Sequence, residues 1–121
     1  MVRKLIVMMV EDADVIQDRL RVLLEKTPEV SKIFCAGNYE EAKKVLYNEQ
    51  IDWAILDINL PEKSGIEVLR YIKTNYPHAR VIMLTNEVNP LYRNLCLKLG
   101  ANYFFDKSTD FDNIPVIISG L

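Results

Sequence analysis

The sequence alternates five times between a short apolar run and a longer segment with helical periodicity. Residues 4–10 are almost continuously apolar or β-branched, as in a strand buried on both faces. In the following segment, 13–26, Ile16, Leu20 and Leu24 recur at helical spacing until Pro28 ends the pattern. The couplet returns four times, with runs at 30–36, 53–56, 80–84 and 103–105 and helices at 39–49, from 66 to the stop at Pro77, at 90–100 and at 111–118.

This alternation predicts the fold class. Strands joined by right-handed helical crossovers run parallel and place helices on both faces of their sheet. We therefore expect a doubly wound α/β fold with a five-stranded parallel sheet, in one domain over residues 1–121. Ligands of such sheets bind beyond the carboxyl ends of the strands, beside the point where the strand order reverses. Functional side chains are expected at those strand ends.

Composition excludes several functional classes. The chain is 50% hydrophobic and 26% charged with a net charge of -2, and it has no basic block, so direct nucleic-acid binding is not expected. No apolar run approaches the roughly 20 residues that cross a bilayer, and Met1 precedes a strand rather than a signal peptide, which predicts a cytoplasmic location. Cys35 and Cys96 lack metal-ligand spacing and are expected to be buried free thiols.

Polar residues follow four of the five predicted strands. Glu11 and Asp12 end the first strand, Asp57 the third, Thr85 the fourth, and Lys107 follows the fifth. Three carboxylates within about 4 Å of one another would repel by roughly 1 to 4 kcal/mol per pair, so the cluster needs a cation. With oxygen ligands and no nearby histidine or cysteine, Mg²⁺ fits best. The sequence therefore predicts a magnesium site at this edge of the sheet.

The same edge is suited to phosphoryl chemistry. A site that is neutral only with Mg²⁺ and Lys107 in place can accept a phosphoryl group, whose oxygens need a metal, an ammonium and a hydroxyl. Asp57, held at the end of a buried central strand, is the expected nucleophile. Thr85 and Lys107 are expected to hold the new phosphate.

The order of these motifs resembles the receiver domain of bacterial two-component response regulators, over the whole chain. The matching motifs are Glu11-Asp12, Leu56-Asp57-Ile58-Asn59-Leu60-Pro61 with Gly65, Leu84-Thr85, and Phe105-Asp106-Lys107. The resemblance implies a flavodoxin-like fold with strand order 2-1-3-4-5. It also implies that Glu11, Asp12, Asp57 and the backbone carbonyl of Asn59 bind Mg²⁺, and that Lys107 pairs with the phosphate.

The resemblance further implies a switch. Thr85 would rotate inward to bond the phosphate, and Phe104, at the family's switch aromatic position, would move inward with it. Asn59 and Glu87 occupy the positions that tune phosphate lifetime. The readout would be a changed surface on the fourth helix, fifth strand and fifth helix, with Leu91 and Tyr92 as our choice for the output face.

The implied partners are those of a signalling protein rather than of an enzyme with its own substrate. The phosphodonor would be a histidine kinase or a histidine phosphotransfer protein, docked on the first helix and the loop after the fifth strand. The domain would catalyse only its own phosphorylation and dephosphorylation, pass the signal to a downstream protein, and exist as a monomer or a weak phosphorylation-dependent dimer. Either it works as a free receiver or it belongs to a longer regulator.

Three positions depart from the commonest receiver pattern. Ser108 stands where most receivers have proline, so a cis peptide there is not assumed. Asn86 replaces the usual small residue after the threonine, and its bulk is expected to slow access to Asp57. Asp106 is expected to compete weakly for Lys107.

Other readings of single residues remain open at this point. Asp12 or Asp14 can serve as a helix cap, Thr85 as a loop hydroxyl, Lys107 as a surface charge, and Phe104 as core or interface packing. His78 is expected to be a solvated loop residue and Trp53 a packing residue.

Rival functions are separated by the same motifs. A haloacid dehalogenase needs a second acid two residues after the nucleophile, where this chain has Asn59. A flavodoxin would bind a flavin phosphate after the first strand, where Glu11 and Asp12 would repel it. The alternative that remains is a receiver-like interaction module that no longer exchanges phosphate.

Overall fold

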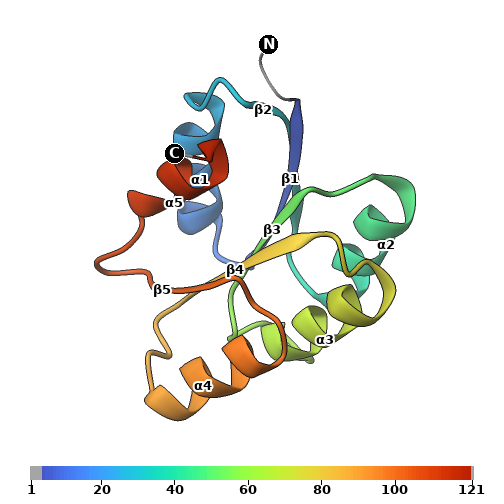
Figure 1. Cartoon of the computed structure of the whole chain (residues 1–121), viewed down its shortest axis with the longest axis vertical. Helices are drawn as coiled ribbons and strands as arrows, with labels where there is room; N and C mark the ends of the chain where they lie inside the picture. Colours follow the sequence, from blue (N-terminus) through green and yellow to red (C-terminus); the bar gives the residue numbers. More distant parts are fainter. Residues whose placement is uncertain (1–3, 121) are drawn as a thin grey trace.

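The computed structural model describes residues 4–120, and within them five parallel strands form one sheet in the order β2-β1-β3-β4-β5 (Figure 1). The elements are β1 (Leu5–Val10), α1 (Asp14–Glu25), β2 (Val30–Ala36), α2 (Tyr39–Asn48), β3 (Trp53–Leu56), α3 (Gly65–Asn75), β4 (Arg80–Thr85), α4 (Pro90–Lys98), β5 (Tyr103–Asp106) and α5 (Asn113–Ser119). The predicted flavodoxin-like α/β fold and its strand order are confirmed. The first and last positions of the predicted domain, 1–3 and 121, lie outside the described residues.

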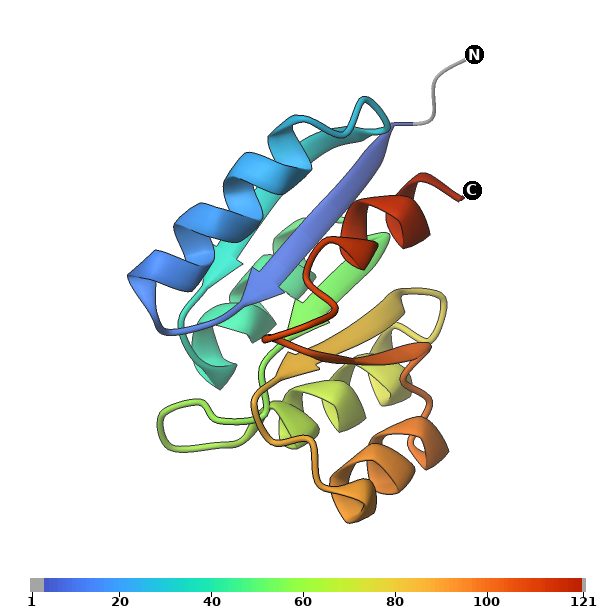
Figure 2. The same cartoon turned by 90° about the vertical axis from the view of Figure 1, so that its left-hand side faces the viewer.

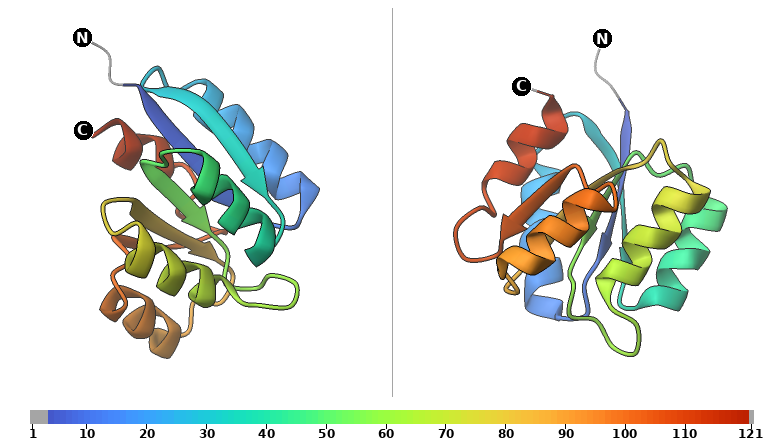
Figure 3. Two further views of the ribbon diagram at one scale, coloured as in Figure 1. Left: turned by 90° about the vertical axis from the view of Figure 1, so that its right-hand side faces the viewer. Right: turned by 60° about the horizontal axis from the view of Figure 1, so that its bottom comes forward.

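Two helical layers cover the sheet, one on each face. Figure 2 shows α1 and α5 on one face, where Leu20, Leu24 and Ile114 pack against inward side chains of β1, β3 and β4. Figure 3 shows α2, α3 and α4 on the other face, with Leu46 and Ile72 in its core. The three central strands are buried almost throughout, which explains why their sequences are continuously apolar rather than alternating.

Local signals set three of the five helix starts and the end of α4. The side chains of Asn38, Ser64 and Asn89 cap α2, α3 and α4 by accepting backbone N–H groups of the first turns. Pro90 begins α4, at the first residue of the predicted range 90–100, because proline suits the first turn of a helix. Gly100, with φ of +108°, follows the end of α4, in the left-handed region that favours glycine.

Three local predictions were wrong. Neither Asp12 nor Asp14 caps α1: Ala13 is the N-cap residue without a side-chain cap, and the Glu11 carboxylate accepts the Ala13 N–H at 3.1 Å. The last helix begins at Asn113 because Phe111 instead turns inward as a buried side chain. Cys35 is half-buried, since β2 lies at the edge of the sheet; Cys96 is buried as expected.

Two other expectations are confirmed, those for Trp53 and His78. Trp53 is buried in the core beside α1 and α5, and His78 is exposed in the loop before β4. No helix within residues 4–120 combines the length and apolarity needed to cross a membrane.

Candidate functional site

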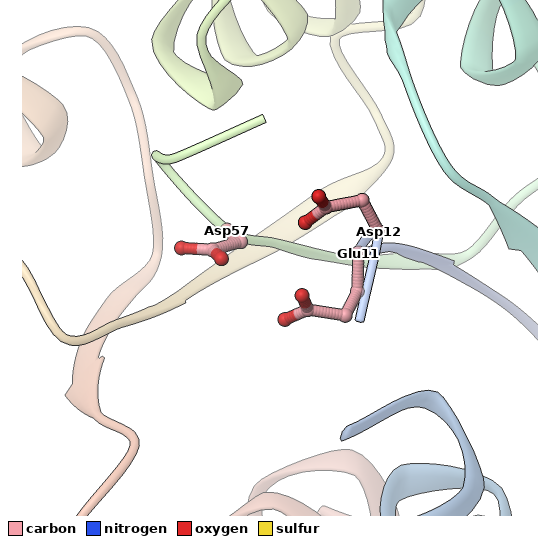
Figure 4. A group of neighbouring side chains, drawn as sticks. All are labelled: Glu11, Asp12 and Asp57. Carbon is pink, nitrogen blue, oxygen red and sulfur yellow. The ribbon is translucent and has the colours of Figure 1, made fainter. Parts of the chain in front are cut away.

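Three carboxylates meet at the carboxyl ends of β1 and β3. One oxygen from each of Glu11, Asp12 and Asp57 lies within 4.8 Å of the others. Figure 4 shows Glu11 and Asp12 extending from the end of β1 toward the side where Asp57 lies. Glu11 and Asp57 are buried, with 3% and 6% of their surfaces exposed, whereas Asp12 is exposed. The cluster predicted from the strand ends is therefore assembled by the fold.

The two buried acids are held by the sheet. The Glu11 N–H donates to the Ala36 carbonyl at 2.9 Å, and the Asp57 N–H donates to the Val10 carbonyl at 3.1 Å. Each acid thus continues the hydrogen bonding between strands one residue beyond its own strand. This fixes their Cα positions, and the apolar runs before them bury the backbone on which they stand.

Lys107 joins the two buried acids from the loop after β5. Its Nζ lies 2.6 Å from Glu11 Oε1 and 2.8 Å from Asp57 Oδ2. Its own N–H donates to the Thr85 carbonyl at 3.1 Å, which anchors the loop to the end of β4. Lys107 and Asp57 are 50 residues apart in the sequence, yet their side chains are in direct contact. The sheet brings them together, because β4 alone lies between β3 and β5.

Burial and ion pairing act on Lys107 in opposite directions. Desolvation lowers the pKa of its ammonium, but the hydrogen bonds and negative charges of Asp57 and Glu11 outweigh it, and the net pKa is raised. Lys107 is therefore a firmly protonated cation at neutral pH. Counted formally, its single positive charge offsets one of the three carboxylates.

The remaining charge and the donor atoms suit a divalent cation. All three acidic groups offer hard oxygen ligands, and the exposed Asp12 carboxylate makes no hydrogen bond or ion pair with any residue in 4–120. No backbone hydrogen bond of that same stretch uses the Asn59 carbonyl oxygen, so a fourth oxygen near Asp57 is available. The acidic triad can thus bind a divalent metal.

Gly65, the first residue of α3, lies against the backbone of Asp57. An ideal Cβ at this position would lie 1.7 Å from the Asp57 carbonyl oxygen, far inside van der Waals contact. The Gly65 N–H also donates to the Ile58 carbonyl at 2.8 Å. Gly65, which the sequence analysis named only as part of the receiver motif, thus lets α3 pack directly against the backbone of Asp57.

Thr85 and the two predicted lifetime positions form a connected group. Thr85 is fully buried, and its Oγ1 accepts the Glu87 N–H at 3.1 Å. The Asn59 side-chain amide donates to Glu87 Oε1 at 3.3 Å, which joins the loops after β3 and β4. Sequence reasoning named these positions but gave no signal that two of them touch.

Phe104 is buried in the core on the α3 and α4 side of the sheet, with 7% of its surface exposed. The guanidinium carbon of Arg93, on α4, lies 6.0 Å from the centroid of the Phe104 ring, and Arg93 also donates to the Phe104 carbonyl at 3.3 Å. The sequence gave no indication of this role for Arg93. Leu91, chosen for the output face, is 77% exposed on the same helix, and Tyr92 is 38% exposed.

The departures from the receiver pattern have structural outcomes. Asp106 was expected to compete for Lys107, but its carboxylate instead accepts the Ser108 N–H at 2.8 Å, and the ion pairs of Lys107 within residues 4–120 are with Glu11 and Asp57. Over the same residues every peptide bond is trans, including the one before Ser108. Asn86 is exposed at the end of β4.

Comparison with protein families identifies the architecture. The model of the response regulator receiver domain matches residues 7–119. The chain belongs to the response regulator receiver domain family. Receiver domains of this family are typically signalling phosphoacceptors of two-component systems and not enzymes. The order of acids, threonine and lysine at the strand ends was therefore a correct guide to the family.

Individual relatives are distant. The Fimbriae Z protein of Salmonella typhimurium is 27% identical over 118 residues, which cover 94% of this chain and 56% of that protein. The chain thus spans about half the length of this curated relative. A CheY-like receiver domain protein from Methanospirillum hungatei superposes with a TM-score of 0.87 at 23% identity, covering 95% of this chain and 90% of that one.

A further solved structure resembles the chain in fold. It is a response regulator from Burkholderia pseudomallei with a phosphorylated aspartic acid, a calcium ion and citrate. Its TM-score is 0.83 at 22% identity, and the match covers 92% of this chain and 64% of that one.

Proposed function

We propose that this receiver accepts a phosphoryl group on Asp57 from a phosphohistidine donor, with Mg²⁺ bound in the acidic cluster. The observation that carries the proposal is the Lys107 ammonium bound to both Asp57 and Glu11 at 2.8 and 2.6 Å, beside Asp12, whose carboxylate has no ion-pair partner within residues 4–120. A structural ion pair would need one carboxylate for one lysine. The surplus negative charge, kept at the open edge of the sheet, is the property expected of a metal and phosphoryl site.

The cation would be held by Glu11, Asp12, Asp57 and the backbone carbonyl of Asn59. Mg²⁺ supplies positive charge to the phosphoryl oxygens as the group is transferred. Oxygen-only ligands and an exposed side suit an ion that keeps several waters.

In the transfer, a carboxylate oxygen of Asp57 forms a bond to phosphorus while the phosphorus–nitrogen bond of the donor breaks. The electron pair of that bond stays on the imidazole nitrogen, which becomes neutral imidazole after proton exchange. Lys107 orients the Asp57 carboxylate through Oδ2 and presents its ammonium to the incoming phosphoryl oxygens. Asn59 holds the other carboxylate oxygen, since its N–H donates to Asp57 Oδ1 at 3.3 Å.

The switch we propose couples the phosphate to Thr85 and Phe104. Rotation of the Thr85 hydroxyl toward a phosphoryl oxygen breaks its hydrogen bond from the Glu87 N–H, at a cost of about 1 kcal/mol that the charged hydrogen bond to phosphate repays. The loop after β4, which the hydrogen bond between the Glu87 N–H and Thr85 holds in place, is then free to move. Phe104 is already inward, so the phosphate would bias the loop and α4 around it.

Membership of the receiver family supports a further proposal about partners and location. We propose a cytoplasmic domain whose donor is a histidine kinase or a histidine phosphotransfer protein. It would signal to a downstream protein through α4, β5 and α5, without binding nucleic acid or membrane itself, as a monomer or a weak phosphorylation-dependent dimer. Asn59 and Glu87 would tune the lifetime of the phosphate.

Phosphorylation with small donors tests the proposal. The protein is incubated with acetyl phosphate or with phosphoramidate, a small donor with the phosphorus–nitrogen bond of phosphohistidine, with and without Mg²⁺, and its intact mass is followed. One phosphoryl adduct that requires Mg²⁺ is expected in the wild type and in Asp112→Asn, an exposed control aspartate, and none in Asp57→Asn. No adduct with either donor in the folded protein would instead support the interaction module that does not exchange phosphate.

A further inference from the structure

A cavity of about 450 Å³ lies at the end of the molecule opposite the acidic cluster. Its wall residues are Leu46, Tyr47, Asn48, Glu49, Gln50, Ile51, Tyr76 and His78. They belong to the end of α2 with the loop before β3, and to the loop between α3 and β4. Figure 3 shows α2 and α3 side by side. Because these loops precede β3 and β4, the cavity opens at the amino ends of the strands, whereas Asp57 stands at their carboxyl ends.

The floor of the cavity is apolar and two of its walls are aromatic. Leu46 and Ile51 are buried, with 2% and 3% of their surfaces exposed. Tyr76 is half-buried, and Tyr47 is 83% exposed. Loss of solvation raises the pKa of the Tyr76 hydroxyl, and the nearby hydroxyls of Tyr71 and Tyr47 raise it further, so a negative charge is disfavoured there.

The rim carries negative electrostatic character. Both α2 and α3 end at this cavity, and the last turn of a helix presents unpaired carbonyl oxygens with the negative end of the helix dipole. The last turn of α2 contains no basic residue, and Glu49 adds a carboxylate.

The basic side chain in the cavity wall is the imidazole of His78, whereas Lys73 of α3 and Arg80 of β4 are engaged elsewhere. Lys73, in the last turn of α3, donates to the Ala79 carbonyl at 2.8 Å and lies 3.5 Å from Asn102 Oδ1. The guanidinium of Arg80 lies 4.9 Å from the ring centroid of Trp53, in the core of the opposite face of the sheet. Neither side chain is among those that line the cavity.

We propose that this cavity binds a small organic cation of the alkylammonium or guanidinium class. The rings of Tyr47 and Tyr76 would contact the cation, and the Glu49 carboxylate and the helix-end carbonyls would lie at the rim of the cavity. Aromatic faces attract such cations through their quadrupoles, and the apolar floor accepts their methyl or methylene groups. A hydrated metal ion would gain nothing from that floor, and an anion would be repelled by the rim. The site is separate from the proposed phosphoryl site and does not depend on it.

The test compares choline with 3,3-dimethylbutan-1-ol, a neutral molecule of the same shape. Each is titrated into the ¹⁵N-labelled full chain, and the amide shifts of Gln50 and Ile51 are followed. Choline is expected to saturate these shifts at about 10 mM, a concentration that would mostly fill even a 1 mM site. The neutral isostere is expected to bind at least about fivefold more weakly.

Two variants locate the binding. Tyr47→Ala changes an exposed side chain, so the fold is retained, and it is expected to weaken choline binding about fivefold. Tyr92→Ala, on α4 away from the cavity, is the matched control and should leave binding unchanged. Equal affinity for choline and its neutral isostere, no saturable shift, or equal effects of the two variants would each overturn the proposal.

Discussion

Replacing Gly65 with alanine should damage stability and the phosphoryl site together. The added Cβ would lie 1.7 Å from the carbonyl oxygen of Asp57 and 2.6 Å from its carbonyl carbon, whereas real Cβ contacts essentially never fall under 3.0 Å. The atoms in the way are backbone atoms of a strand end, so no flexible side chain can move aside. Either the start of α3 must retreat by more than about 1 Å or Asp57 must shift.

The magnitude follows from the contacts that this movement disturbs. Overpacking of this kind costs about 1 to 3 kcal/mol, and loss of the Gly65 N–H bond to the Ile58 carbonyl costs about 1 kcal/mol more. Alanine recovers up to about 1 kcal/mol through its higher helix propensity. We expect the free energy of unfolding to fall by about 1 to 4 kcal/mol. A shift of about 1 Å at Asp57 should also slow phosphorylation at least tenfold.

Urea unfolding and the rate of reaction with acetyl phosphate measure both effects. The matched control is Gly37→Ala, where the nearest atom to the new Cβ is the flexible Glu41 Oε1 at 3.4 Å, and where a change within about 0.5 kcal/mol is expected. If Gly65→Ala is as stable as the control and reacts at the wild-type rate, the packing argument for Gly65 is wrong.

Three further predictions concern the charges of the site. Lys107→Met should lower stability at neutral pH by about 2 kcal/mol, because buried Glu11 and Asp57 lose their cation. Since the pKa of Lys107 is raised in the folded state, its contribution to stability should be complete below the ordinary lysine value of 10.5 and disappear as the pH rises through the higher folded value. The urea midpoints of wild type and variant should converge over that rise in pH. A constant gap between the two midpoints would contradict this prediction. Mg²⁺ at ten times its dissociation constant should raise the free energy of unfolding of the wild type by about 1.4 kcal/mol. In thermal melts at the same Mg²⁺ concentration, Asp12→Asn should lose most of this gain. An equal gain in the variant would show that Asp12 is not a metal ligand. Glu87→Gln keeps an oxygen acceptor for Asn59 but removes a negative charge at the site, so the anionic donor acetyl phosphate should react about threefold faster by intact mass; an unchanged rate would show that this charge does not limit access.

The fold was predictable because its signals are local and repeated. Continuous apolar runs such as 53–56 indicated buried parallel strands, and the helical spacing of apolar residues indicated the helices between them. Errors arose where a long-range contact outweighed a local preference. Phe111 is an example: it has helical spacing with the last helix, but burial beneath the guanidinium of Arg19 keeps it in the turn.

The candidate site was predictable to the level of its members. Glu11, Asp12, Asp57, Thr85 and Lys107 stand where apolar strands end, and the carboxyl ends of parallel strands share one edge, so their proximity follows from strand order. The magnesium ion, the transfer to Asp57 and the switch remain proposals.

The pattern of residue types along the chain is enough to specify the parallel sheet, the family and the acidic residues at the strand ends, since each follows from local patterns and from their order along the chain. Contacts between distant segments depend on how the elements pack. The pairing of Lys107 with both buried acids, the approach of Gly65 to the Asp57 carbonyl and the Asn59–Glu87 hydrogen bond are of this kind. They join positions that no local spacing connects, and side-chain direction at the end of each loop decides them.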